Sequence, residues 1–299
     1  MDTQTKIAII AIVTIIPILS FAVWNIDQSI ISAAADSTEI SVMTSFYPLY
    51  EFTKQVGQDK VRVSLLVPPG IEPHDWEPTI NELQKMYEAN LIVINGIGFE
   101  SWVDDIDTIN SGVVIVDTSA GVSLINIDHS SVDPHIWLNP VMAKTQVTNI
   151  VNALIKIDPT NEKFYRDNAK SYQAKLDSLD TKIKNELSAC KKDFITFHNA
   201  FLYFSIQYDL NQHTIIRSND SHSEPTLKTL EQIINLAKKF NIDVIFAEEA
   251  LDTRTSQVIA NEIGAKVLVL SPIEVGDENS NYLSKMENNL LNLKEALCN

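Results

Sequence analysis

Three of the six histidines in the sequence lie just past the carboxyl end of a predicted strand or in the loop beyond it. His74 occurs in the segment EPHDWEP, His135 in DPHIWL and His198 in FHNAF. Imidazole nitrogen is a good ligand for Zn²⁺, Cu²⁺, Ni²⁺ and Fe²⁺ and a poor one for Mg²⁺ or Ca²⁺. Three imidazoles that converge from separate strand ends would build most of a tetrahedral metal site. Each histidine alone is more ordinarily a surface or helix-capping residue, so this interpretation depends on their convergence.

The elements that must position these histidines read as alternating strands and helices. Short, continuous runs rich in Val and Ile favour parallel strands that are buried on both faces, and the alternation predicts helices on both sides of each sheet. The strands are expected at residues 39–44, 61–67, 91–95, 113–117, 194–197, 214–216, 243–247 and 266–270. The shorter helices are expected at residues 47–56, 79–89, 200–208, 227–240, 256–263 and 281–296.

A longer helix is predicted between the two series, from Asp158 to about Ala189. Apolar side chains recur there at three- and four-residue steps, and no Gly or Pro interrupts them after Pro159. At ~1.5 Å per residue the helix would be ~45 Å long, more than one sheet needs. We therefore expect two α/β lobes, each with a roughly four-stranded parallel sheet flanked by helices, joined by one long rigid helix, with the ligand in the cleft between the lobes. The expected boundaries are 39–157, 158–190 and 191–299.

Residues 1–38 are expected to be a signal peptide or an N-terminal membrane anchor. Lys6 precedes the uncharged run Ile7–Trp24, which is about long enough to cross a bilayer, where roughly 20 residues are needed. The run Ala33-Ala34-Ala35 matches an Ala-x-Ala cleavage site, but its distance from the apolar run keeps an uncleaved anchor open. Under both interpretations the rest of the chain is exported, to the periplasm or the cell surface.

Charge and cysteine content narrow the class of protein. The formal net charge of −16 argues against a nucleic-acid partner, because binding a phosphate backbone needs a basic face. Cys190 and Cys298 are the two cysteines, and an exported protein could pair them. The sequence does not show whether their Cα atoms lie within range, so the pairing stays open.

Four segments in this order resemble the signature segments of the metal-specific solute-binding proteins of zinc and manganese ABC importers: EPHDWEP, DPHIWLNP, FHNAFLYF and VIFAEEALDTRTSQVIANEIGAKVLVLSPIE. The resemblance extends from about residue 39 to residue 296. It implies two α/β lobes linked by one long helix, with the metal between them. Its first three ligand positions correspond to His74, His135 and His198. Manganese-type members carry an acidic residue in place of His198, so the resemblance implies the zinc-type subgroup and Zn²⁺ as the ligand.

The fourth ligand position is less direct. Many members of the family carry an Asp where this sequence has Ser271, but a zinc-type subgroup uses the Glu of a Leu-x-Pro-Ile-Glu segment, which corresponds to Glu274 in LSPIE. The resemblance therefore implies a metal site of His74, His135, His198 and Glu274. A water molecule in the fourth position, with Glu248 nearby, is the alternative.

The resemblance implies a zinc-binding protein that delivers its ion to an ABC importer permease in the membrane, with no catalytic residue; we expect a monomer. The alternatives are a manganese- or iron-binding homologue, a metal-dependent surface adhesin, and a zinc hydrolase with Glu248 as general base. No HExxH segment or nucleophile elbow supports the hydrolase. Because histidine ligands must be deprotonated, we expect the affinity to weaken below about pH 6.5.

Several further residues are candidates for supporting roles. Asp75 and Asp133 are placed to orient imidazole rings, and Trp76 and Trp137 to exclude water or to fill the core. Among the remaining histidines, His213 and His222 are the candidates for auxiliary ligands. His129 lies where zinc-binding relatives often carry a long His-rich loop, but here the loop is short and holds one His, which argues against a metal-gathering role.

Overall fold

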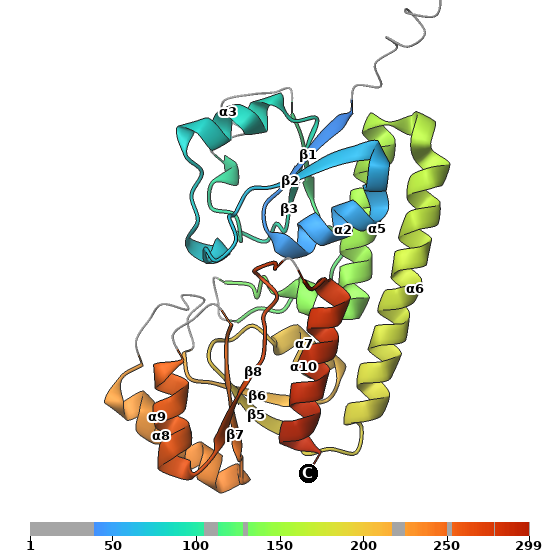
Figure 1. The fold of residues 1–299 in the computed structure, drawn as a ribbon. Helices are drawn as coiled ribbons and strands as arrows, with labels where there is room; N and C mark the ends of the chain where they lie inside the picture. Colours follow the sequence, from blue (N-terminus) through green and yellow to red (C-terminus); the bar gives the residue numbers. More distant parts are fainter. Residues whose placement is uncertain are drawn as a thin grey trace, which may run out of the picture. The chain divides into compact units, whose positions relative to one another are not determined.

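The first sheet of the computed structural model carries four parallel strands in the order β2-β1-β3-β4 (Figure 1). The structure describes residues 39–104, 113–127, 131–216, 225–249, 253–277 and 279–298. The bounds of the strands are β1 (Ile40–Thr44), β2 (Val61–Leu65), β3 (Leu91–Ile94) and β4 (Val114–Asp117). Strand β3 is buried along its whole length, as expected for an inner strand covered on both faces.

The second sheet repeats this arrangement with the order β6-β5-β7-β8, again with parallel pairs. Its strands are β5 (Asp193–Thr196), β6 (Asn211–Thr214), β7 (Val244–Ala247) and β8 (Lys266–Val269). In each sheet the strand that comes first in the sequence, β1 or β5, is an inner strand. The next strand pairs with one of its edges, and the strand after that pairs with its other edge, so the strand order reverses at β1 and at β5. Such a reversal point opens a crevice at the carboxyl ends of the strands.

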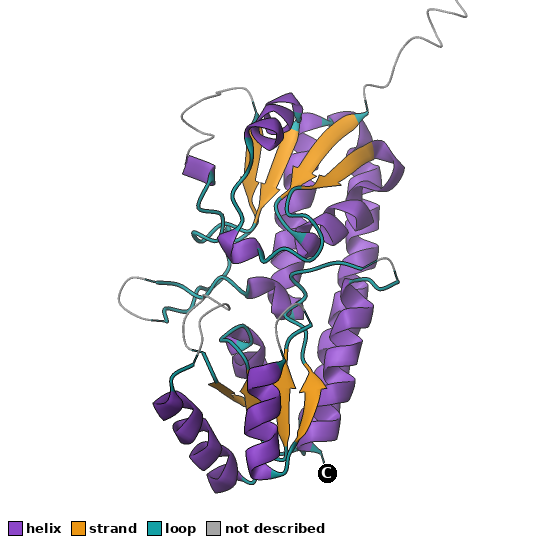
Figure 2. Ribbon diagram, turned by 60° about the vertical axis from the view of Figure 1, so that its left-hand side comes forward, coloured by secondary structure: helices purple, strands orange, loops and turns teal. Residues whose placement is uncertain are grey.

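Helices cover both sheets (Figure 2). Their bounds are α2 (Tyr47–Gly57), α3 (Ile80–Glu88), α5 (Pro140–Ile157), α6 (Glu162–Leu187), α7 (Leu202–Gln207), α8 (Leu227–Phe240), α9 (Arg254–Ile263) and α10 (Tyr282–Leu297), with 3₁₀ turns η1 (Gln58–Lys60), η2 (Pro73–Asp75), η3 (Ile136–Leu138) and η4 (Pro159–Asn161). A capping box opens α3, because Thr79 Oγ1 accepts from the backbone of Glu82 and the Glu82 side chain accepts from the backbone of Thr79.

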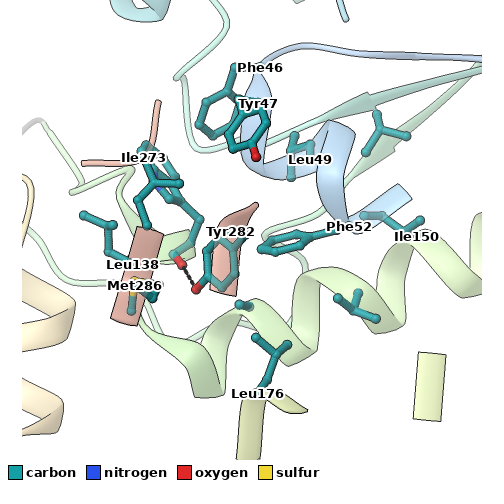
Figure 3. Packing of buried hydrophobic residues seen from close by; sticks show 14 of the residues in the cluster. Phe46, Tyr47, Leu49, Phe52, Leu138, Ile150, Leu176, Ile273, Tyr282 and Met286 are labelled. Carbon is teal, nitrogen blue, oxygen red and sulfur yellow. Dashed lines mark hydrogen bonds between the residues drawn. The ribbon is translucent and has the colours of Figure 1, made fainter. Parts of the chain in front are cut away.

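The long helix α6 runs alongside both sheets (Figure 1). It contacts α2 and α5 of the N-terminal half and α10 of the C-terminal half. Its 26 residues correspond to ~39 Å. The larger of two apolar clusters extends past the boundary between the halves, whereas the smaller one lies within the C-terminal half. In the larger cluster, Tyr282 of α10 packs its ring 4.9 Å from Phe52 of α2 and donates a hydrogen bond of 2.6 Å to the carbonyl of Trp137 (Figure 3). The described residues from Ile40 onward belong to one compact unit.

The structure corrects two elements expected from the sequence. Strand β6 begins three residues before the expected start at Thr214, because the polar stretch from Asn211 pairs with β5; the backbones of Ile215 and Ile216 continue this pairing beyond the strand. Helix α5 was not expected at all. Asn139 caps it, accepting from Val141 N at 2.9 Å.

The cysteine pairing that the sequence left open is made: a disulfide joins Cys190, after α6, to Cys298, at the end of α10. The expected signal peptide or anchor, residues 1–38, lies outside the described residues. Among the residues that are described, no helix is both long enough and apolar enough to cross a bilayer.

Candidate metal centre

The structure brings together all four residues expected at the metal site. The imidazole nitrogens of His74, His135 and His198 and a carboxylate oxygen of Glu274 all lie within 4.8 Å of one another. His135 Nε2 lies 3.2 Å from His74 Nε2 and 3.3 Å from His198 Nε2. Glu274 Oε1 lies 3.5 Å from His74 Nε2 and 3.6 Å from His135 Nε2. Two donors bound at 2.0–2.1 Å to a tetrahedral Zn²⁺ are about 3.3 Å apart, so these separations fit such an ion.

The four side chains come from four different loops at strand ends. His74 lies in η2, in the loop after β2, and its ring contacts that of Phe99 at 4.7 Å. The side chain of Glu72 accepts a hydrogen bond of 3.4 Å from the backbone of His74. The proline between them fixes the backbone of this turn. His74 therefore enters the site from a constrained segment of the N-terminal half.

His135 is held from both sides by residues of its own half. Its Nδ1 and its backbone N–H lie 2.7 and 2.9 Å from Asp133 Oδ1. The side chain of Asn95, at the end of β3, donates to the carbonyl of Pro134 at 2.9 Å. Because Nδ1 faces a carboxylate, Nε2 is left to face the site.

His198 follows β5 directly, as expected from the sequence. Glu248, at the end of β7, accepts from the backbone of His198 at 3.1 Å and lies 2.6 Å from His198 Nδ1. Both residues are buried. Glu248 thus orients the imidazole from the side opposite the site, with Nε2 again directed at the other histidines.

Glu274 lies in the segment from Ser271 to Asp277, after β8. Trp137 Nε1 donates a hydrogen bond of 2.7 Å to the carbonyl of Pro272, which ties this segment to the N-terminal half. Glu274 is 5% exposed, and within the described part of the chain its Oε1 is buried without a hydrogen-bond partner. A buried carboxylate oxygen without a donor is costly unless a cation offsets it, which fits a metal ion among these four groups.

The pKa values of the three histidines shift in different directions. Burial lowers the pKa of His135, and the opposing attraction of Asp133 does not overcome it. Burial also acts to lower the pKa of His198, but the charge and hydrogen bond of Glu248 outweigh it and raise the pKa to about 9. For His74 the contact with Glu274 outweighs burial, so its pKa is raised.

The pKa values of two further carboxylates, Glu274 and Glu72, shift in opposite directions. Burial acts to raise the pKa of Glu274, but the attraction of His74 and the other imidazoles outweighs it and lowers the pKa to about 2. Burial, followed by repulsion from Glu274, raises the pKa of Glu72 to about 7. Glu72 was not among the residues predicted from the sequence, although its position two residues before His74 was an available signal.

The supporting residues take the following places. Asp133 contacts an imidazole as expected, whereas Asp75 is exposed. The ring of Trp137 lies 5.1 Å from that of His135, and Trp76 packs against Trp102 at 5.8 Å.

The auxiliary histidines lie away from the site or outside the described residues. His213 lies 2.9 Å from Asp193 and stacks on Phe240, away from the four ligand candidates. His129 and His222 lie outside the described residues.

Comparisons with known proteins show that the chain is similar to zinc-uptake proteins. The family model described as zinc-uptake complex component A, periplasmic, matches residues 42–296. The high-affinity zinc uptake system protein ZnuA of Bacillus subtilis (strain 168) is 37% identical over 288 residues, covering 89% of this chain and 90% of the relative.

Two solved structures share the fold. The Zn(II)-bound ZnuA-like domain of Streptococcus pneumoniae AdcA matches with a TM-score of 0.78 and 34% identity, over 86% of this chain and 98% of the domain. The laminin-binding protein Lmb of Streptococcus agalactiae, described as a bifunctional protein with adhesin and metal-transporting activity, matches with a TM-score of 0.81 and 31% identity, over 86% of this chain and 98% of that chain.

Proposed function

The chain belongs to the family of periplasmic component A proteins of zinc-uptake complexes, and from this we propose that it captures Zn²⁺ outside the cytoplasmic membrane for an ABC-type importer. The observation that carries the proposal is the convergence of three Nε2 atoms and one carboxylate oxygen from four loops. Three neutral imidazoles and one carboxylate leave a zinc site with a net charge of +1. A harder ion such as Mn²⁺ would favour more carboxylate oxygens.

Zn²⁺ is cargo in this proposal. His74 and His135 donate from the N-terminal half, and His198 and Glu274 donate from the C-terminal half. With four protein donors the ion is fully enclosed, as suits a carrier. Release then follows docking to the permease of the importer, with the chain acting as a monomer.

We divide the chain accordingly into a signal peptide or anchor (1–38), an N-terminal lobe (39–157), a linking helix (158–190) and a C-terminal lobe (191–299). The first segment would place the metal site in the periplasm or at the cell surface. The linking helix would hold the two lobes at a nearly constant separation.

A hydrolase remains the rival from another class, and the contacts of Glu248 argue against it. A general base must reach the water that it activates. Glu248 instead lies against Nδ1 and the backbone of His198, on the far side of that imidazole. Glu274 occupies the place where a catalytic zinc site would keep a water molecule. We therefore propose that the chain catalyses no reaction.

Adhesion is a second candidate function, favoured by the likeness to Lmb of Streptococcus agalactiae, which is described as both adhesin and metal transporter. Binding of the protein to immobilised laminin, measured with and without Zn²⁺, tests it. Absence of binding under both conditions would exclude this function.

Elemental analysis of the protein purified without added metal tests the main proposal. We expect about one zinc per chain in the wild type and a large loss in His198→Ala. The matched control is His213→Ala, which removes a histidine of the same half that lies outside the cluster. Equal zinc in the wild type and in His198→Ala would contradict the proposal, as would manganese or iron in place of zinc.

A further inference from the structure

The segment that carries Glu274, Ser271 to Asp277, is held near both its ends by one buried ammonium group. Lys285, on the first turn of α10, is 6% exposed. Its Nζ lies 2.9 and 3.0 Å from the two carboxylate oxygens of Glu249, in the loop after β7, and 3.2 Å from Asp277 Oδ2. The ammonium thus joins a neighbouring loop to the far end of the segment.

Glu249 passes this restraint to the beginning of the segment. Its Oε1 accepts a hydrogen bond of 2.7 Å from Ser271 Oγ, and that same Oγ accepts from the backbone of Ile273 at 3.0 Å. Asn289, one turn further along α10, accepts from Ser271 N and donates to the carbonyl of Ser271. The chain of contacts from Lys285 therefore ends one residue before Glu274.

The backbone between these two tethers is held in an unfavourable conformation. Ile273 has φ of +61°, in the left-handed region that a β-branched residue rarely adopts. Its side chain is fully buried and packs in the core shown in Figure 3. A conformation of this kind persists only where the surroundings over-determine it. Loss of a tether would let the segment relax and carry Glu274 away from the imidazoles.

Among the described residues, the ion-pair partners of Lys285 are Glu249 and Asp277, and neither belongs to the four ligand candidates. Lys285 therefore acts on the site only through the segment that carries Glu274. We propose that Lys285 is a positioning residue that holds Glu274 against the bound ion and so sets how long the ion stays. This inference rests on the proposed function, since it requires Zn²⁺ bound by Glu274. Removal of a residue that supports a metal ligand typically costs 10- to 100-fold in affinity.

The test measures Zn²⁺ release into a chelating dye by stopped flow, with Lys285→Met as the main variant because Met keeps most of the side-chain length without the charge. We expect release to be about 10- to 100-fold faster than in the wild type. Lys285→Arg should recover most of the slow release. The matched control is Lys294→Met, which removes another lysine of α10 whose ion pair with Glu186 at 2.6 Å lies far along the helix from Glu274. This control should release Zn²⁺ at the wild-type rate.

A second background separates positioning of Glu274 from general damage to the fold. In Glu274→Gln the added change Lys285→Met should have no further effect on release, because the group that Lys285 positions is already lost. With Co²⁺ in place of Zn²⁺, both single variants should show the same weakened visible absorption as the fourth protein donor leaves. Thermal unfolding of the metal-free variants monitors the fold.

The outcomes are distinct. Wild-type release rates in Lys285→Met, or an equal further acceleration in the Glu274→Gln background, would overturn the positioning role while Zn²⁺ binding by the wild type still stands. A wild type that binds no Zn²⁺ would overturn the proposed function itself.

Discussion

The two halves of the molecule each present to the site a buried imidazole whose Nδ1 lies against a carboxylate, but they assemble this pair differently. In the N-terminal half the partner of His135 is Asp133, two residues away in the same loop, at 2.7 Å. In the C-terminal half the partner of His198 is Glu248, 50 residues away on another strand end, at 2.6 Å.

The same contact leads to opposite protonation. The pKa of His135 is lowered, with burial as the largest cause, whereas Glu248 raises the pKa of His198 to about 9. In the metal-free protein at neutral pH, His135 is therefore ready to bind an ion, and His198 carries a proton that the ion must displace. A carboxylate beside an imidazole thus fixes its orientation in both halves, but only in one half does it also hold a competing proton.

Removal of either imidazole is expected to have the largest effect. Structural zinc sites bind with about 10–16 kcal/mol, so one of four ligands contributes roughly 3 kcal/mol, or about 100-fold in affinity. We expect His135→Ala and His198→Ala each to lose at least about 100-fold. Competition with a zinc-chelating dye measures this. A loss confined to one half would show that the other half does not bind the ion.

Replacement of each carboxylate by the corresponding amide should distinguish the two halves, with losses in Zn²⁺ affinity of about 10- to 100-fold. At pH 7, Asp133→Asn should weaken Zn²⁺ binding more than Glu248→Gln. The reason is that loss of the Glu248 charge also lowers the pKa of His198 and relieves competition by its proton. Dye competition at pH 7 and pH 9 measures both variants. If the two variants lost the same Zn²⁺ affinity at both pH values, the proposed difference between the two carboxylates would be wrong.

The pH dependence of the wild type should show the proton on His198 directly. A pKa raised to about 9 means that the proton is bound below that pH. The apparent Zn²⁺ affinity should therefore fall by at least about tenfold per pH unit as the pH drops from 9 to 7, because a proton on His74, whose pKa is also raised, adds to the loss. This places the onset higher than the value near 6.5 expected from an unperturbed imidazole. Glu248→Gln should flatten the slope, and Asp133→Asn should keep it. Titration calorimetry in buffers of different ionisation enthalpy counts the protons released.

The smallest expected change is in the relative orientation of the two sheets when Zn²⁺ binds. Helix α6 is continuous, and Tyr282 of α10 is packed against Phe52 of α2. Separation of the halves would expose this apolar core, which opposes wide opening. Crystal structures with and without Zn²⁺ should therefore differ by a small rotation. A rotation of tens of degrees would refute the expectation.

Much of the fold could be predicted because its signals are local. The Val- and Ile-rich strands and the Thr79–Glu82 capping box depend on near neighbours in the sequence. Strand β6 was placed too late because its first residues are polar and only their pairing with β5 makes them a strand. Helix α5 was missed although Asn139-Pro140 is a proper start signal and its buried residues recur at three- and four-residue steps. Its many Val, Ile and Thr residues have a lower helix propensity than Ala or Leu, which weakened the signal.

The residues of the site could likewise be predicted only where their contacts are local. Asp133 could be named as a partner of His135 because both lie in one short turn. Glu248 could be named only as a nearby carboxylate, since its contact with His198 depends on how β5 and β7 pair. Glu274 was predicted from the resemblance of its segment to a family motif, and no spacing pattern in the sequence indicated it. The strained backbone at Ile273 that presents Glu274 is visible only in three dimensions.

The disulfide between Cys190 and Cys298 has a consequence for proteolysis. It encloses the entire second sheet, and His198 and Glu274 with it, in one covalent ring. A single protease cut anywhere between residues 191 and 297 leaves both fragments attached, so the nicked protein migrates as one band on a gel without reductant and as two bands with it. A cut between β4 and α6 separates the fragments under both conditions.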